Sequence, residues 1–181
     1  MLVNNALNTR SRIVEVEAWG TAVSSNQALA ANGGTASASS TTANSGFPGY
    51  NFLPSVTNDG DRRGGVNFWR DDTASVYPDW LQVDFNGSKS ITEIDVFTVQ
   101  DNEQNTVEPT QAMTFSLNGI TAYDVQYWTG AAWVTVPNGG VTGNNKVWRQ
   151  FTFSPIMTSK IRVLVNNALN TRSRIVEVEA Y

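Results

Sequence analysis

The sequence contains neither cysteine nor histidine among its 181 residues. Without cysteine there is no disulfide framework, no thiol nucleophile and no thiolate metal site. Without histidine the chain lacks the commonest general base, a Ser-His-Asp triad and all imidazole metal ligands. We therefore expect a non-catalytic protein. Secreted vertebrate domains usually carry disulfides, so an extracellular or cell-surface location favours a bacterial source.

Charge is also scarce, since charged residues make up 15% of the chain and leave a net charge of −4. Ser, Thr, Asn and Gly take their place, as is common in extracellular β-proteins. Nucleic acids and anionic membranes attract proteins through basic patches, so this composition argues against both as partners. No apolar run approaches the length of a membrane span. The chain is long enough for one domain with a sizeable core.

What the sequence does contain is an exact internal repeat. Residues Leu2–Ala18 recur without change at Leu164–Ala180, an offset of 162 residues. Each copy has the pattern of a strand, a polar turn and a second strand. We interpret residues 1–19 as a duplicated copy of the C-terminal hairpin and residues 20–181 as the domain itself. Identical hairpins compete for one place in a fold, and the C-terminal copy should fill it because closing it costs less loop entropy.

Three origins of the duplication stay open. In the first explanation, the chain is cut from a tandem array and keeps the tail of a preceding unit. Alternatively, the first copy was added by design, so that two hairpins form a two-state switch. In the third explanation, hairpins are exchanged between identical neighbouring modules, as in strand-exchange assembly.

The body of the chain has the pattern of β-structure. In WLQVDF at 80–85, Leu81, Val83 and Phe85 alternate with polar residues and face one way. Pairs such as Asn86-Gly87 indicate turns, and no amphipathic helix of ten residues is found. Many short strands with close turns predict an antiparallel sandwich or barrel. The expected strands lie within 35–46 and at 80–85, 91–99, 123–128, 132–136, 147–153 and 160–165, followed by the final hairpin.

Three segments resemble the discoidin, or F5/8 type C, family. They are YPDWLQVDFNGSKSITEIDVF at 77–97, PSVTNDGDRRG at 54–64 and RIVEVEAY at 174–181, and the resemblance covers residues 27–181. The family includes galactose-binding-like modules of the family 32 carbohydrate-binding type. The resemblance implies an all-β, antiparallel jelly-roll β-sandwich of about eight strands. It also implies a glycan or another extracellular polymer as partner.

The same resemblance implies a structural calcium ion at the acidic loop. Carried over to this chain, the ligands are Asp59, Asp61, Glu177 and the carbonyls of Val56 and Gly64. The loop supports this on its own chemistry, because calcium takes six to eight oxygen ligands and prefers carboxylates and carbonyls. A solvated Asp-Gly turn is the alternative interpretation.

Aromatic and polar residues in loops predict where a glycan would bind. A sugar needs a flat apolar face together with polar groups that distinguish its hydroxyls. The predicted contact residues are Trp69, Arg70, Tyr77, Asn170 and Arg172. Galactose-binding relatives often use a histidine, which this chain lacks. The alternative is that Trp69 and Tyr77 pack beneath the loops as core.

The predicted function is therefore a non-catalytic extracellular carbohydrate-binding or adhesion module with a structural calcium ion. The alternative is a structural tandem-repeat module of an extracellular fibre or stalk that assembles through hairpin exchange. Phe47, Tyr50 and Phe52 form a second aromatic loop. Tryptophans on strands are expected in the core: Trp80, Trp128, Trp133 and Trp148.

Overall fold

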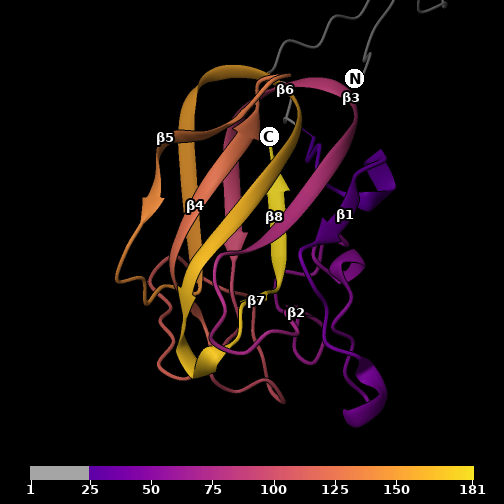
Figure 1. Cartoon of the computed structure of the whole chain (residues 1–181), viewed down its shortest axis with the longest axis vertical. Coiled ribbons are helices and arrows are strands. Elements are labelled where there is room, and N and C mark those ends of the chain that lie inside the picture. The colour runs from indigo at the N-terminus through magenta and orange to yellow at the C-terminus, as the bar shows by residue number, and fades with distance from the viewer. Residues whose placement is uncertain (1–24) are drawn as a thin grey trace, which may run out of the picture.

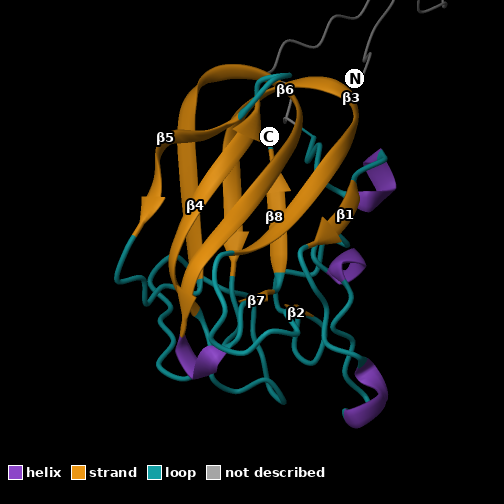
Figure 2. Ribbon diagram, viewed as in Figure 1, coloured by secondary structure: helices purple, strands orange, loops and turns teal. Residues whose placement is uncertain are grey.

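The computed structural model describes residues 25–181, which are almost entirely β-structure with a few short 3-10 turns (Figure 2). The strands are β1 (Thr35–Ala38), β2 (Trp69–Arg70), β3 (Asp79–Phe97), β4 (Ile120–Trp128), β5 (Trp133–Val141), β6 (Trp148–Ala168), β7 (Arg174–Ile175) and β8 (Glu177–Ala180). The 3-10 turns are η2 (Ala30–Asn32), η3 (Asn44–Gly46), η4 (Pro54–Val56) and η5 (Leu169–Thr171). The predicted all-β antiparallel sandwich is confirmed.

Two long strands, β3 and β6, form the spine of the sandwich. They pair antiparallel from Asp79 opposite Val165 to Phe97 opposite Trp148. The first half of β3 lies between β1 and β6, and its second half lies between β8 and β6. Strands β4 and β5 follow on the far side of β6, which gives the order β1-β3-β6-β4-β5 (Figure 1). Register shifts along β3 let the two strands bend together across both layers.

These long strands correct two of the predicted boundaries. The sequence predicts separate strands at 80–85 and 91–99, and again at 147–153 and 160–165, whereas each pair forms one strand. Gly87 does adopt a left-handed φ of 80°. The ladder resumes at Lys89, however, so the Asn-Gly pair produces a register shift between Asp84 and Lys89 instead of a hairpin turn. Pairing along the whole strand overrides the local turn signal.

The core follows the predicted alternation. Leu81 and Val83 are buried on one face of β3, and Ile161 and Val163 are buried on the paired stretch of β6. The four strand tryptophans, predicted to lie in the core, are all only partly buried, although Trp148 packs against the buried cluster that includes Phe97. Trp80, for example, shares its face with Gln82 and Asp84 and so points away from the core.

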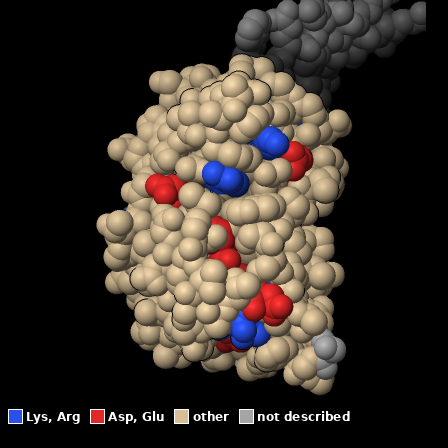
Figure 3. All heavy atoms as spheres, in the orientation of Figure 1, with Lys and Arg blue, Asp and Glu red and all other residues tan. Residues whose placement is uncertain are grey.

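The surface carries little charge. On the face drawn in Figure 3, charged side chains are few, and some positive ones lie beside negative ones. Within residues 25–181 no helix is long and apolar enough to cross a membrane. This face therefore shows no broad basic patch of the kind that nucleic acid would need.

The C-terminal copy of the repeat forms the final hairpin. Residues 164–180 supply the end of β6, η5, β7 and β8, and β8 pairs with β3. Ile175, Val178 and Ala180 within it are at most 1% exposed. The backbone N–H of Gln27 donates to the Ala180 carbonyl at 2.7 Å, so the start of the described chain lies beside its end. The N-terminal copy, residues 1–19, lies outside the described residues.

Equivalent substitutions in the two copies test which one the fold requires. Ile175→Asp puts a charge into the core, so we expect the free energy of unfolding to fall by roughly 4 kcal/mol or more. Ile13→Asp makes the same change in the N-terminal copy, and deletion of residues 1–19 removes that copy. Both should leave the denaturation midpoint nearly unchanged. A strong loss of stability in either would show that the fold uses the N-terminal copy.

Candidate functional site

The loops at one end of the sandwich enclose a hollow of about 240 Å³. Its walls include parts of β2, β7 and η5, at the end away from the C-terminus (Figure 1). We call it the loop-end hollow. It is lined by Phe47, Tyr50, Phe52, Phe68, Arg70, Glu103, Asn118, Asn170 and Arg174.

One wall of the loop-end hollow is aromatic. Phe52 and Phe68 are each 2% exposed, and their ring centroids lie 5.2 Å apart. Phe47 packs edge-on against Phe52 and is 39% exposed, while Tyr50 contacts both Phe52 and Phe68. The two buried rings thus support two outer rings. Such a wall offers an apolar surface to the C–H face of a ligand.

Strands β2 and β7 decide which side chains face the hollow. Trp69 lies opposite Ile175, and Arg70 lies opposite Arg174. Residues directly opposite each other in an antiparallel pair share one face. Trp69 and Ile175 accordingly face the core and are 0% exposed, whereas Arg70 and Arg174 both face the hollow.

Arg70 is the group in this hollow with unused hydrogen-bonding capacity. Its guanidinium lies over the ring of Phe47, 5.0 Å from the centroid, and over Phe52 at 5.5 Å. Its Nε is buried and has no hydrogen-bond partner among the described residues. Burial lowers the pKa of Arg70, and the nearby Arg172 lowers it further. A buried N–H without an acceptor is unfavourable, so a ligand oxygen here would be stabilised.

The remaining polar groups of the hollow are held in place. Glu103 accepts from the Tyr50 hydroxyl at 3.3 Å and from the Asn118 amide at 3.4 Å. The Asn170 amide donates to Asn118 Oδ1 at 2.9 Å. Arg174 donates to backbone carbonyls, including that of Asn118, and burial lowers its pKa to about 10. The hollow therefore combines fixed donors and acceptors with an aromatic wall.

The predicted contact residues divide into two groups. Arg70 and Asn170, two of the predicted contact residues, line the hollow. The prediction for Trp69 is wrong, because its ring is buried and its Nε1 donates to the Ser40 carbonyl at 2.9 Å.

Tyr77 and Arg172 do not line the loop-end hollow either. Tyr77 packs against the main core, with its hydroxyl 3.4 Å from the Ala168 carbonyl. Arg172 donates to the Asp71 carbonyl at 3.0 Å and lies 3.8 Å from an Asp72 oxygen.

Several residues of the hollow were not predicted. Glu103 and Asn118 come from the segment between β3 and β4, which has neither regular apolar spacing nor a family motif. Arg174 lies two residues from the predicted Arg172 but was not singled out. Only the fold brings these three side chains to the same end as Arg70.

The acidic loop lies against the first residue of β8. Glu177 is 0% exposed, and its Oε1 accepts from the Gly60 N–H at 3.1 Å. Its Oε2 is buried and has no hydrogen-bond partner among the described residues. Burial raises the pKa of Glu177 to about 8, and the nearby charge of Asp59 adds to this effect. A buried carboxylate with an unused oxygen fits a site that receives a cation.

Two of the other predicted calcium ligands, Asp61 and Gly64, already have hydrogen-bond partners. The Asp61 carboxylate faces Arg63 at 2.9 Å, and this hydrogen bond lowers the pKa of Asp61. Val56 ends η4, and the Gly64 carbonyl accepts from the Asn67 N–H at 2.9 Å. In residues 25–181 no three acidic side chains lie close enough to hold a metal on their own. An ion at this loop would therefore depend on backbone carbonyls as well.

The F5/8 type C domain family matches residues 35–178 of the chain. The chain belongs to this family. The resemblance found in the three sequence segments is confirmed. No curated protein matches the chain in sequence.

Several solved structures share the fold. Chitosan-binding module 1 of a Paenibacillus sp. IK-5 chitosanase/glucanase has a TM-score of 0.62 and 21% identity, covering 87% of this chain and 99% of that one. A Streptococcus pneumoniae fucose-binding module has a TM-score of 0.61 and 19% identity, covering 86% and 94%. The family 32 CBM of C. perfringens NanJ, in complex with galactose, has a TM-score of 0.57 and 21% identity, covering 81% and 92%.

Glu177 predicts how stability depends on pH in metal-free buffer. Its pKa is raised from 4.5 to about 8, so between these values the folded chain holds a proton that the unfolded chain releases. The free energy of unfolding must therefore fall as the pH rises through this range. Glu177→Gln keeps the acceptor for Gly60 and removes the titration, so its melting temperature should fall less steeply. Part of the slope should persist, because burial also raises the pKa of Asp95, to about 7.

A matched control is Glu108→Gln, which changes an exposed glutamate and should keep the slope of the unchanged chain. Thermal melts in chelator across this pH range measure all three proteins. Equal slopes for Glu177→Gln and the unchanged chain would contradict the assignment of a titrating group at Glu177.

Proposed function

We propose that the chain is a non-catalytic carbohydrate-binding module that holds a glycan in the loop-end hollow. The observation that carries this proposal is the buried Nε of Arg70, which has no hydrogen-bond partner in residues 25–181, beside the exposed ring of Phe47. Together they offer a hydrogen-bond donor and an apolar face within one small hollow. This is the combination that a pyranose ring requires.

Each wall has a separate role in this proposal. The C–H face of a sugar packs against Phe47 and Tyr50, while Arg70 donates to a hydroxyl or ring oxygen. Glu103 accepts from sugar hydroxyls, with its position fixed by Tyr50 and Asn118. Glycoside hydrolysis usually needs two carboxyl groups across the bond that breaks. Among the described lining residues Glu103 is the single carboxylate, which favours binding over catalysis.

The structural relatives support a glycan as the ligand class. Their ligands differ: galactose in the NanJ module, fucose in the pneumococcal module and chitotriose in chitosan-binding module 2 of the Paenibacillus enzyme. The shared fold therefore accommodates several sugars, and the identity of the sugar depends on the residues of each hollow. In this chain those residues include no histidine.

We also propose a calcium ion at the acidic loop, held by Glu177 and Asp59 together with the carbonyls of Val56 and Gly64. The unpartnered Oε2 of Glu177 supports the fit, because a cation there would compensate a charge that burial otherwise disfavours. Asp61 would join only if it left Arg63. The ion would fasten the 54–64 loop to β8, and its role would be structural.

An extracellular or cell-surface location on a bacterium, with a role in adhesion, completes the proposal. The low charge and the abundance of Ser, Thr, Asn and Gly support it. The exact repeat favours a second candidate, a structural module of a fibre or stalk that exchanges hairpins with identical neighbours. Sedimentation distinguishes the two: exchange requires that the full chain associates and that the chain lacking residues 1–19 does not.

Substitutions at Arg70 and Phe47 test the glycan site. Arg70→Gln removes a charged donor, so we expect glycan affinity to fall about 10- to 100-fold. Phe47→Ala removes a partly exposed ring, and a loss of about 3- to 10-fold should follow. The control is Arg162→Gln, which removes a cation bound to Gln126 on β4, away from the hollow, and should leave affinity unchanged. Calorimetric titration with glycans selected on an array measures this.

The glycan proposal fails under either of two results. One is that no glycan binds the unchanged chain. The other is that Arg70→Gln and Phe47→Ala bind as tightly as Arg162→Gln does.

Metal removal tests the calcium site. Binding to the folded state alone adds RT ln(1 + [L]/Kd), or about 2.7 kcal/mol at 100 times Kd. Calcium should therefore raise the melting temperature of the chelated protein, and more strongly at pH 8 than at pH 6, because fewer Glu177 carboxylates hold a competing proton at the higher pH. Glu177→Gln should respond less. Equal melting temperatures with calcium and with chelator would rule out a stabilising ion.

A further inference from the structure

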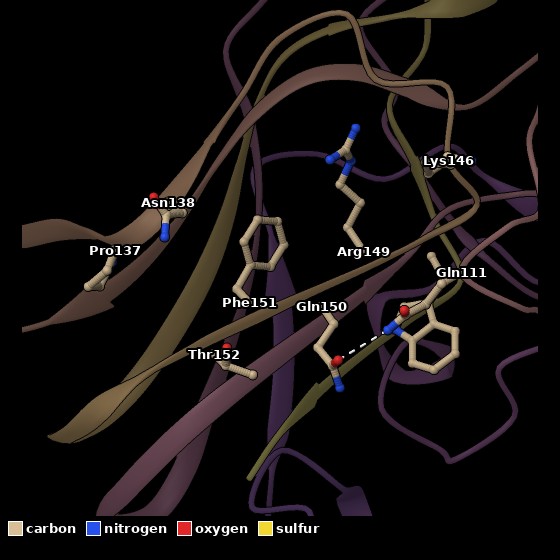
Figure 4. Close-up of a pocket in the computed structure, with 9 residues that line it drawn as sticks. Gln111, Pro137, Asn138, Lys146, Arg149, Gln150, Phe151 and Thr152 are labelled. Carbon is tan, nitrogen blue, oxygen red and sulfur yellow. Dashed lines mark hydrogen bonds between the residues drawn. The ribbon is translucent and has the colours of Figure 1, made fainter.

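A second and larger hollow lies on the side of the sandwich, away from the loop-end residues. It has a volume of about 460 Å³ and opens between β5 and the first half of β6 (Figure 4). In this half β6 pairs with β3 on one edge, from Phe97 opposite Trp148 to Ile91 opposite Ile156. The pairs of β6 with β4 begin only at Ile161. Among the described residues, the other edge of this half of β6 therefore has no paired strand, and the hollow opens there. We call this opening the side hollow.

Side chains from both faces of β6 line the side hollow. Figure 4 shows Arg149 and Phe151 on one side of the strand and Gln150 and Thr152 on the other. Phe151 is 6% exposed and packs edge-on against Tyr123 behind it, 6.3 Å between centroids. Phe151 is thus a core residue of which only a small part reaches the hollow, and Arg149 also lines the hollow.

The charge of the side hollow is positive. Lys146 and Arg149 line it, and the described lining residues include no Asp or Glu. Lys146 donates to the Ala112 carbonyl at 3.2 Å, and Arg149 Nε donates to Asn144 Oδ1 at 2.8 Å. Neither cation forms an ion pair within residues 25–181. Two cations without an ion pair among the described residues stand out in a chain with a net charge of −4.

We propose that the side hollow binds an anionic saccharide unit, a pyranose that carries a carboxylate or a sulfate group. Charge-assisted hydrogen bonds to Lys146 and Arg149 would hold the anionic group, and such bonds are roughly twice as strong as neutral ones. The small exposed part of Phe151 offers an apolar contact to the ring. At the rim, the amide of Gln111 donates to Gln150 at 3.1 Å and leaves further amide groups for hydroxyls (Figure 4).

This site is independent of the loop-end hollow, with which it shares no lining residue. An acidic polysaccharide could thus bind the side of the module while another glycan occupies its end. The experiment uses the full chain carrying Arg70→Gln, so that the loop-end hollow contributes little.

Matched polymers identify the anionic group. Polygalacturonate is compared with its methyl ester, which loses the charge, and dextran sulfate is compared with dextran. We expect binding to at least one charged member and at least 10-fold weaker binding to its neutral partner, with affinity falling as salt rises. Preference for polygalacturonate assigns a carboxylate and preference for dextran sulfate assigns a sulfate. No charge preference in either pair overturns the proposal.

Variants locate the binding. Lys146→Gln/Arg149→Gln should weaken binding to the charged polymer about 10- to 100-fold. The control Lys89→Gln/Arg162→Gln removes the same charge from residues outside the side hollow and should have little effect. Lys146→Gln alone preserves the Arg149–Asn144 contact, so a partial loss in this variant excludes misfolding as the cause. Equal losses in the control pair would mean nonspecific charge attraction and would overturn the proposal.

Discussion

The antiparallel pairing of β3 with β6 is the interaction on which the rest of the structure depends. These are the two longest strands, and they remain paired along nearly their whole length. Because both bend at the same place, one ladder contributes to both layers of the sandwich. Strands β1, β4 and β8 attach to its edges, and the residues that alternate inward along it form the centre of the core. Among the described residues, the first half of β6 pairs with β3 but not with β4, and the side hollow opens at this unpaired edge.

The final hairpin connects this strand pair to two candidate sites, the loop-end hollow and the acidic loop. It begins as the last part of β6, turns at η5, and returns through β7 and β8. On the way it supplies Asn170 and Arg174 to the loop-end hollow and Glu177 to the acidic loop. It is also the segment that the sequence repeats exactly at residues 2–18. The sequence therefore repeats the same segment that, in its C-terminal copy, joins the core to these two sites.

Much of the fold follows from the sequence, and much of the site does not. Alternation in WLQVDF correctly places Leu81 and Val83 in the core, because a strand half-buried in a sandwich imposes period two. The same alternation places Trp80 on the face opposite to Leu81. The prediction that Trp80 lies in the core rested on its residue type alone and missed this. Trp69 was misplaced for a related reason: its exposure depends on the β2–β7 register, which no local pattern reveals. Glu103 and Asn118 reach the hollow through topology, so no spacing in the sequence could indicate them.

The central claim is that the loop-end hollow binds a sugar through Arg70 and its aromatic wall. Amide chemical-shift changes in the ¹⁵N-labelled chain, titrated with galactose, fucose and chitotriose, test this most directly. The account predicts that at least one sugar shifts the amides of Glu103, Asn118 and Asn170 together, along with the Arg70 side-chain Nε–H. Shifts confined to other surfaces, or none with any of these sugars and none with glycans selected on an array, would contradict it.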